Sequence, residues 1–265
     1  MKLLVVYHSG VGNTKFVAEI LYHKLLLTND VELKAVEDVI DGIRYDDFDG
    51  FIFGFPTYHV NPSVSMTNFL DHIEKVEDKK PVYIFTTCGW FSANSARIFA
   101  KSCLDKNFIP VLSRSFRCPG TDGVLLAPYI RFFYTFEKKL LDKIEIDVNE
   151  INKVFSPNPR VNMPKFSWAS VLNYPNMKLG QAYTFNINLH KDNCIKCGKC
   201  IKHCNVKGLI LGDNGYPIFN KDNCEKCYRC IHHCSENALS LSKKKMPNRL
   251  LTQEFYDTYL KKLRL

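Results

Sequence analysis

Eight cysteines near the end of the chain form two blocks with the same spacing, C-x2-C-x2-C-x3-C. Three thiolates separated by two residues let one tight loop hold three irons of a [4Fe–4S] cube. The fourth cysteine leaves on a short helix and is carried to the other cube. We therefore expect two clusters, one held by Cys194, Cys197, Cys200 and Cys234, and one held by Cys224, Cys227, Cys230 and Cys204.

Zinc and disulfides are the alternative uses of so many cysteines. A structural zinc site takes four ligands with a long gap between two pairs, which two tandem four-cysteine blocks do not offer. Disulfides are typical of secreted chains, and this sequence carries no secretory feature. Because the same spacing occurs twice, the iron–sulfur interpretation is favoured.

This part of the chain resembles the bacterial two-[4Fe–4S] ferredoxins, with one departure. That family usually has proline directly after each fourth cysteine, whereas this sequence has Asn205 and Ser235. Proline would withhold an N–H group. Its replacement leaves a donor that can reach a cluster sulfur, so we expect a raised reduction potential.

Length and composition are those of an ordinary water-soluble protein. The 265 residues, 46% hydrophobic and 24% charged, allow one sizeable domain and a small one. No run of eighteen apolar residues is present, and the N-terminal LLVVY run is too short for a signal peptide. We expect a cytoplasmic protein without a transmembrane segment.

The formal charge of +9 suggests nucleic-acid binding at first sight. Two clusters with their thiolates, each at about −2, bring the total to about +5, and a bound phosphate brings it to about +3. Lysines and an arginine stand among the cluster cysteines, where they compensate cofactor charge. We therefore expect no nucleic-acid partner.

The N-terminal residues predict a phosphate site. Residues 3–7 form a short apolar run typical of a buried parallel strand, and an amphipathic helical pattern follows from residue 16. The Gly/Ser/Thr loop between them offers free N–H groups and the positive end of a helix dipole. The loop matches neither the P-loop nor the G-x-G-x-x-G motif. Its residues are Ser9, Gly10, Val11, Gly12, Asn13 and Thr14.

Apolar strands alternate with helices over the first half of the chain. Expected strands cover 31–38, 48–56, 81–89 and 108–116, with helices around 63–76, 93–106 and 127–144. This alternation predicts an α/β fold with a five-stranded parallel sheet wound on both faces. Ligands of such sheets bind beyond the carboxyl ends of the strands. Two loops at that edge carry aromatic and small polar residues suited to a flat ring: Pro56, Thr57, Tyr58 and His59; Thr87, Cys88, Gly89, Trp90 and Phe91.

Residues 1–145 resemble flavodoxin. The family's phosphate loop, (S/T)-x-T-G-x-T, is matched by Ser9, Gly12 and Thr14, with Val11 in place of the expected threonine. The resemblance implies FMN, with the two aromatic loops beside its isoalloxazine ring and Trp90 or Tyr58 stacked on it. Three further cysteines, Cys88, Cys103 and Cys118, are expected to pack in the core.

The remaining segments join and follow these parts. Residues 146–190 are rich in proline and aromatics, unlike a flexible linker, and are expected to pack those aromatics in an ordered connector. The ferredoxin-like α+β domain is expected at 191–242. Residues 243–265 begin with a basic run and continue as an amphipathic helix, expected to dock on its own chain rather than on a membrane or a partner.

The whole chain apart from the connector resembles the flavodoxin–ferredoxin fusion family of anaerobic prokaryotes, the EFR-type ferredoxins. This implies an electron-transfer protein in which two clusters and FMN convert between one-electron and two-electron carriers and exchange electrons with a redox partner protein. Two alternatives stay open: a flavin-dependent reductase of a small substrate, and a cluster-based redox sensor. The sequence identifies no acid–base site for the former, and a homo-oligomer is also left open.

Overall fold

The computed structural model describes residues 1–38, 43–172, 186–241 and 251–263. The chain divides into two compact units, and each is described here by itself. The first unit comprises Met1–Ser9, Asn13–Arg117 and Phe136–Leu172. The second unit comprises Gly10–Gly12, Cys118–Thr135 and Asn173–Leu265.

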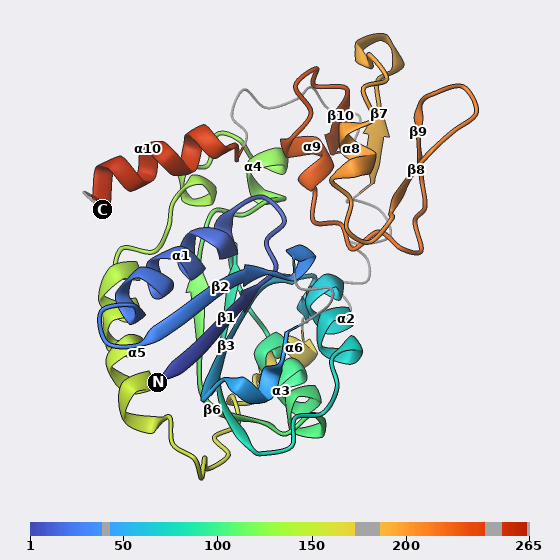
Figure 1. Cartoon of the computed structure of the whole chain (residues 1–265). Helices are drawn as coiled ribbons and strands as arrows, with labels where there is room; N and C mark the ends of the chain where they lie inside the picture. The colour runs from blue at the N-terminus through green and yellow to red at the C-terminus, as the bar shows by residue number, and fades with distance from the viewer. Residues whose placement is uncertain (39–42, 173–185, 242–250, 264–265) are drawn as a thin grey trace. The chain divides into compact units, whose positions relative to one another are not determined.

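A parallel sheet forms the centre of the first unit (Figure 1). Its five parallel strands lie in the order β2-β1-β3-β5-β6, and the two-residue strand β4 (Asn61–Pro62) pairs antiparallel with β3. With the parallel strands numbered by themselves this is the order 2-1-3-4-5, the flavodoxin-like doubly wound arrangement. The predicted α/β fold is therefore confirmed. The strand bounds are β1 (Lys2–Tyr7), β2 (Asp30–Ala35), β3 (Gly50–Tyr58), β5 (Lys80–Cys88) and β6 (Phe108–Arg117).

Helices cover both faces of this sheet. Helices α1 (Asn13–Leu25) and α5 (Leu140–Val154) lie on one face, and α2 (Val64–His72) and α3 (Ser95–Asp105) on the other (Figure 1). The central strands are apolar and buried on both sides for this reason. Under α2 and α3, the Phe108 ring meets Phe51 and Phe53 edge-on, with centroids 4.8 and 5.3 Å apart.

One buried polar cluster joins α5 to the sheet. Asp147 on α5 is fully buried, and its carboxylate accepts hydrogen bonds at 2.6 Å from the Tyr83 hydroxyl and from the Arg114 guanidinium. A carboxylate can be buried when its charge is paired and its oxygens are hydrogen-bonded. Burial, together with Asp147, raises the pKa of Tyr83 well above its usual value, so the phenol stays a donor.

The helix predicted over residues 127–144 is wrong. A one-turn helix, α4 (Gly123–Leu126), comes first, capped by the Asp122 side chain, which accepts from the Gly123 N–H at 2.8 Å. Pro128 then excludes helical backbone at the preceding residue. A 3-10 turn, η3 (Arg131–Tyr134), follows, and regular helix begins at the start of α5. Turn and cap chemistry overrode the apolar pattern here.

The first part of the connector runs along the edge of the first unit through main-chain hydrogen bonds. Asn162 N–H donates to the Pro110 carbonyl of β6 at 2.7 Å, and the Arg97 guanidinium of α3 donates to the Pro164 carbonyl at 2.8 Å. The expected aromatic packing holds at Phe155, which is buried. It is wrong at the pair Phe166 and Trp168, whose side chains are exposed. Residues 173–185, with Tyr174 and Pro175, lie outside the described residues.

The second unit is built from two similar halves. Strands β7 (Ile187–Leu189) and β10 (Leu239–Leu241) pair antiparallel, and β8 (Leu209–Leu211) and β9 (Pro217–Phe219) form a hairpin. One-turn helices carry the middle of each cysteine block: α8 (Lys199–Lys202) and α9 (Arg229–His232). The terminal helix α10 (Gln253–Leu263) buries Tyr256. Among the described residues, no helix is long and apolar enough to cross a bilayer.

Candidate functional site

The two cysteine blocks repeat one backbone path. Each block places three residues in the left-handed region, at positions 30 residues apart, with nearly equal φ angles. Most of these residues carry a Cβ atom, for which this conformation is unfavourable. Such conformations persist where the chain must turn tightly, as around a compact group. The pairs are Lys196 (58°) and Lys226 (54°), Gly198 (71°) and Tyr228 (60°), Lys207 (52°) and Asn237 (50°).

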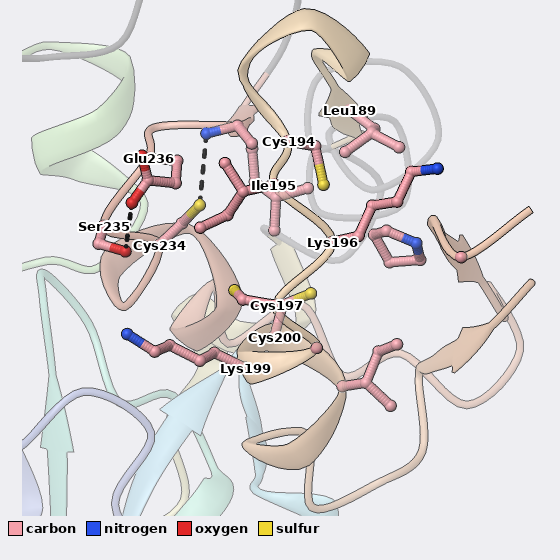
Figure 2. A pocket seen from close by; sticks show the side chains of 16 residues that line it. Leu189, Cys194, Ile195, Lys196, Cys197, Lys199, Cys200, Cys234, Ser235 and Glu236 are labelled. Atoms are coloured by element: carbon pink, nitrogen blue, oxygen red, sulfur yellow. Dashed lines mark hydrogen bonds between the residues drawn. The ribbon is translucent and has the colours of Figure 1, made fainter.

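The first block lines a pocket that is partly open to solvent. Figure 2 shows the sulfur atoms of Cys194, Cys197, Cys200 and Cys234 around a common space. Three of these cysteines come from the first block and one from the second. The rest of the lining is mainly apolar: Leu189, Ile195, Ile201, Pro217, Ala238 and Leu239.

The second block gathers its thiols in a more buried place. Burial raises the pKa of Cys230 well above its usual value, and the neighbouring Cys227, Cys224 and Cys204 thiols raise it further. The pKa values of Cys224 and Cys227 are raised by burial, with Cys204 again adding to the rise. Cys204 therefore lies close to the three cysteines of the other block, and Cys200 of the first block also raises the pKa of Cys230.

Each fourth cysteine receives a backbone hydrogen bond that the sequence did not indicate. Gly208 N–H donates to the Cys204 sulfur at 3.1 Å, and Ala238 N–H donates to the Cys234 sulfur at 3.3 Å. The donors stand four residues after the cysteines, not directly after them at Asn205 and Ser235. A donor of this kind stabilises a thiolate over a thiol. The duplicated small residue at this position, glycine and alanine, was the only sequence signal for it.

No single-ion site accompanies these thiols. Within the described ranges, no three His, Cys, Asp or Glu side chains converge closely enough to bind one metal ion. The first four thiols instead surround a space larger than one ion (Figure 2). A zinc site would bring its ligand atoms to about 2.0–2.3 Å from one centre. The thiols therefore surround a space rather than converge on one point.

Hydroxyl groups collect at the carboxyl edge of the parallel sheet in the first unit. Thr14, at the start of α1, and Thr87, near the end of β5, are buried, and their hydroxyl oxygens lie 2.8 Å apart. Asn13 is also buried at the start of α1. The predicted phosphate loop and one predicted ring loop thus meet at this edge.

A second hydroxyl chain joins the first predicted ring loop, Pro56–His59, to β5 and to α3. Thr57 Oγ1 lies 2.7 Å from Thr86 Oγ1 and 2.7 Å from Ser95 Oγ, and Ser95 donates to the Ser92 carbonyl at 2.8 Å. Thr86, Ser92 and Ser95 were not among the predicted site residues. The sequence signal for these three residues was the group of hydroxyl residues in and after the TTCGW run, where a strand ends and a helix begins.

Comparison with known proteins identifies the first unit. The family described as "Flavodoxin domain" matches residues 4–113. These residues are therefore similar to a flavodoxin domain, and this part of the chain is called the flavodoxin domain below. The strand order of the parallel sheet agrees with this similarity.

Three relatives show how far the likeness extends. The chain is 32% identical over 72 residues to a flavodoxin of Clostridium saccharobutylicum, covering 27% of this chain and 45% of that protein. It is 31% identical over 126 residues to the flavodoxin-like domain-containing protein BilS of Clostridioides difficile, covering 45% and 66%. The chain therefore spans less than two thirds of either protein. A third match, to pyruvate synthase subunit PorD of Pyrococcus horikoshii, has 30% identity over 77 residues, 29% of this chain and 67% of that subunit. The matched residues therefore belong to the same family as that subunit.

The ring loops of the flavodoxin domain differ in exposure. Trp90 is 76% exposed, whereas Tyr58 and His59 are half-buried. His59 and Val60 both have positive φ, 47° and 64°, in the tight turn that joins β3 to β4. This turn geometry normally takes Asn and Gly, and a β-branched residue is strained in it. Strain of this kind is typical of ligand-binding loops.

The remaining cysteines of the flavodoxin domain are buried, as expected. Cys88 has its sulfur 3.6 Å from the Ser115 hydroxyl, and burial raises the pKa of its thiol. Burial alone raises the pKa of Cys103 well above its usual value. Both thiols stay protonated near neutral pH, which makes them poor nucleophiles.

Residues Gly10–Gly12, in the middle of the predicted phosphate loop, belong to the second compact unit and not to the first. Gly12 has φ +125°, a conformation that side chains rarely adopt. A Cβ atom at this position would lie 2.6 Å from the Tyr256 ring of the same unit. Glycine is therefore required here both by backbone conformation and by space.

Proposed function

We propose that this chain is an electron-transfer protein that binds FMN on its flavodoxin domain and two [4Fe–4S] clusters on its second unit. The observation that carries the proposal is the cavity that four thiols share, three from the first block and one from the second. Crossed ligation of this kind is typical of two-cluster ferredoxins.

The second thiol group supports a second cluster. Cys204 lies near Cys224, Cys227 and Cys230, and burial disfavours the ionised form of each of those three. Four thiolates in one buried place repel one another unless a cation is bound between them. Iron would displace the thiol protons, so cluster binding would stabilise this half of the unit.

The carboxyl edge of the flavodoxin domain supports FMN. Thr14 and Asn13 sit at the N-terminus of α1, where free N–H groups and the helix dipole favour a phosphate monoester. The loops with Thr57 and Thr87 are tied to neighbouring elements through hydroxyl pairs and are held ready for a planar ring. Val11 supplies no hydroxyl where flavodoxin has threonine.

The two kinds of cofactor complement each other chemically. Each cubane cluster passes one electron at a time, and FMN takes up one or two. The chain would hold both and exchange electrons with an external redox protein. The side chains identified here bind and orient these groups, and no residue is assigned an acid–base role.

Anaerobic purification followed by iron, sulfide and flavin analysis tests the proposal. We expect about eight irons and eight sulfides per chain from two cubanes, together with about one FMN. An iron content near two or less per chain, or zinc in place of iron, would contradict the cluster assignment.

A substitution at Gly12 separates the flavin from the clusters. Gly12→Val should abolish FMN retention, because neither the positive φ nor the space admits a side chain, while the iron content stays unchanged. Tyr256→Ala is the matched control, since it removes the ring that a new side chain would strike but leaves the glycine. Retention of FMN by Gly12→Val would show that the phosphate binds elsewhere.

A further inference from the structure

The two cysteine blocks carry different charges although their cysteine spacing is the same. Residues 191–207 contain five lysines and one aspartate, so their formal charge is +4. Residues 221–237 contain three basic and three acidic residues, so their formal charge is zero. Of the two blocks, only the first therefore carries an excess of positive charge around its thiol group.

The same block is also the exposed one. Cys197 is exposed and Ile195 is 65% exposed, whereas their counterparts Cys227 and Glu225 are half-buried. The contrast continues along the one-turn helices, where Lys202 is exposed and its counterpart His232 is 2% exposed. The first thiol group thus lies nearer the surface than the second: three cysteines of each group are half-buried, the fourth being exposed in the first group and buried in the second.

Local contacts hold two of the first block's lysines in place. Lys196 donates from its ammonium to the Asn214 carbonyl at 2.9 Å and lies 4.4 Å from the centre of the Tyr216 ring. Lys191 lies 5.6 Å from the same ring. Cation–π contacts of this kind leave the positive charge uncompensated. The β8–β9 hairpin therefore fixes positive charge on one side of the first thiol group.

Two more lysines stand on α8, on the other side of the cysteines. Lys199 and Lys202 are exposed, and the Lys199 ammonium points away from the sulfur atoms (Figure 2). In the part of the chain that the structure describes, no ion pair joins Lys191, Lys196, Lys199 or Lys202 to a carboxylate. Their charges are available to a partner.

We propose that this basic collar, formed by Lys191, Lys196, Lys199 and Lys202 around Cys197 and Ile195, is the docking surface for an acidic electron-transfer protein. The proposal rests on the proposed function, because it needs a cluster at the first thiol group. Charge complementarity selects the partner: a ring of unpaired lysines attracts a carboxylate-rich surface and raises the association rate. The exposed Ile195 supplies a small apolar contact at the centre, which suits a weak, short-lived complex.

The transfer itself makes and breaks no bond. One electron passes between the partner's iron–sulfur or flavin centre and the first cluster, so that one centre is oxidised as the other is reduced, and no proton is required. The exposed cysteine at this cluster shortens the path from a docked protein. The second thiol group, which lies less near the surface, offers no comparable surface.

A charge-reversal pair tests the surface in the holoprotein. The variant is Lys199→Glu with Lys202→Glu, and the control is Lys101→Glu with Lys221→Glu, which changes the net charge equally at exposed positions outside the collar. The probe is a small acidic two-cluster ferredoxin, reduced beforehand, and stopped-flow absorbance follows electron transfer. At low ionic strength the collar variant should react at least about tenfold more slowly than the wild type, and the control about as fast as the wild type.

The dependence of the electron-transfer rate on salt concentration gives a second test, because dissolved ions screen the attraction between charged surfaces. The wild-type rate should fall steeply between about 20 and 500 mM salt, and the collar variant should lose most of that dependence. Equal rates for the collar variant and the control would overturn the proposal. Binding of a single-stranded oligonucleotide by the wild type, lost in the collar variant without any change in the ferredoxin rate, would assign the collar to nucleic acid instead.

Iron analysis keeps this proposal distinct from the proposed function. Each variant should contain about eight irons and keep the visible spectrum of the wild type, so that a slow rate reports docking rather than cluster loss. A wild type without clusters would refute the proposed function, and the docking surface with it. A fully loaded wild type with unchanged rates in the collar variant would refute the docking surface alone.

Discussion

Residues 194–204 and 224–234 share one cysteine spacing, one set of left-handed residues and one backbone hydrogen bond to the fourth sulfur, yet they differ in almost everything around the cysteines. The first block is basic and exposed. The second is neutral and packed against residues from elsewhere in its unit: the His232 ring donates to the Thr121 carbonyl at 2.9 Å and accepts from the Leu251 N–H at 3.2 Å. Cysteine spacing thus sets the shape of a block, and the residues between the cysteines set its surroundings.

The state of His232 illustrates the difference. Burial lowers the pKa of this histidine to about 4, so it is neutral near pH 7 and can both donate and accept. Its counterpart in the first block, Lys202, keeps its charge in solvent. The same position therefore holds a buried, hydrogen-bonded histidine in one block and an exposed, charged lysine in the other.

The largest expected effect comes from breaking the crossed ligation. If each fourth cysteine binds the cluster of the other block, Cys234→Ala should remove the exposed cluster. Cys204→Ala should then remove the buried one. Each variant should lose about four of eight irons. A chelator should strip the wild type in two phases, because Cys197 is exposed and Cys230 is buried. Cys234→Ala should keep the slow phase and Cys204→Ala the fast one, and the reverse result would show that each block holds its own cluster.

A smaller effect is expected from the residues that follow the second cysteine of each block. Tyr228 is 1% exposed, so Tyr228→Gly should destabilise the unit by about 3 kcal/mol, even though it relieves a left-handed tyrosine. Gly198→Ala should cost only about 1 kcal/mol, because no atom lies within 4 Å of the new Cβ. The urea midpoint for loss of cluster absorbance, under anaerobic conditions, should rank the two variants in this order. Equal midpoints would mean that the second block is as exposed as the first.

The smallest effects concern the two N–H donors. Gly208→Ala places a Cβ atom 3.0 Å from the Cys224 Cα, so the two blocks must move apart slightly, at a cost of about 1–2 kcal/mol. In the matched variant, Ala238→Gly, the chain gains backbone freedom and loses one methyl group. Together these changes should lower the free energy of unfolding by about 1 kcal/mol. Both should be read by the same urea midpoint. A larger loss for Ala238→Gly would show that the packing of the second block, rather than the contact between blocks, limits stability.

The sequence predicted the parallel sheet well, because the strands of such a sheet follow short-range apolar patterns, whereas the assignment of cysteines to two clusters stays a prediction. Strand β5 was expected at 81–89 and lies at Lys80–Cys88. The helix over 127–144 was wrong because Asp122 and Pro128 impose a cap and a break that outweigh an apolar pattern. The exposure of Phe166 and Trp168 was also missed, since this part of the connector is held by its main-chain N–H and carbonyl groups rather than by these two rings.

The difference between the cysteine blocks could not be predicted in the same way. His232 is buried because Thr121 and Leu251 reach it from positions far along the chain in both directions. The sequence around each block contains no sign of which copy will be covered. The difference in charge was visible in the sequence, but its meaning depends on which block is exposed.

The proposed exchange of fourth cysteines between the two clusters would also bear on how the protein is made. A chain emerging from the ribosome presents Cys194, Cys197 and Cys200 first, but their fourth partner, Cys234, emerges last of all eight. The second set, which takes Cys204 from upstream, is complete four residues earlier, at Cys230. The block synthesised first therefore obtains its full set of ligands second, and neither set can be completed until almost the whole second block has been translated.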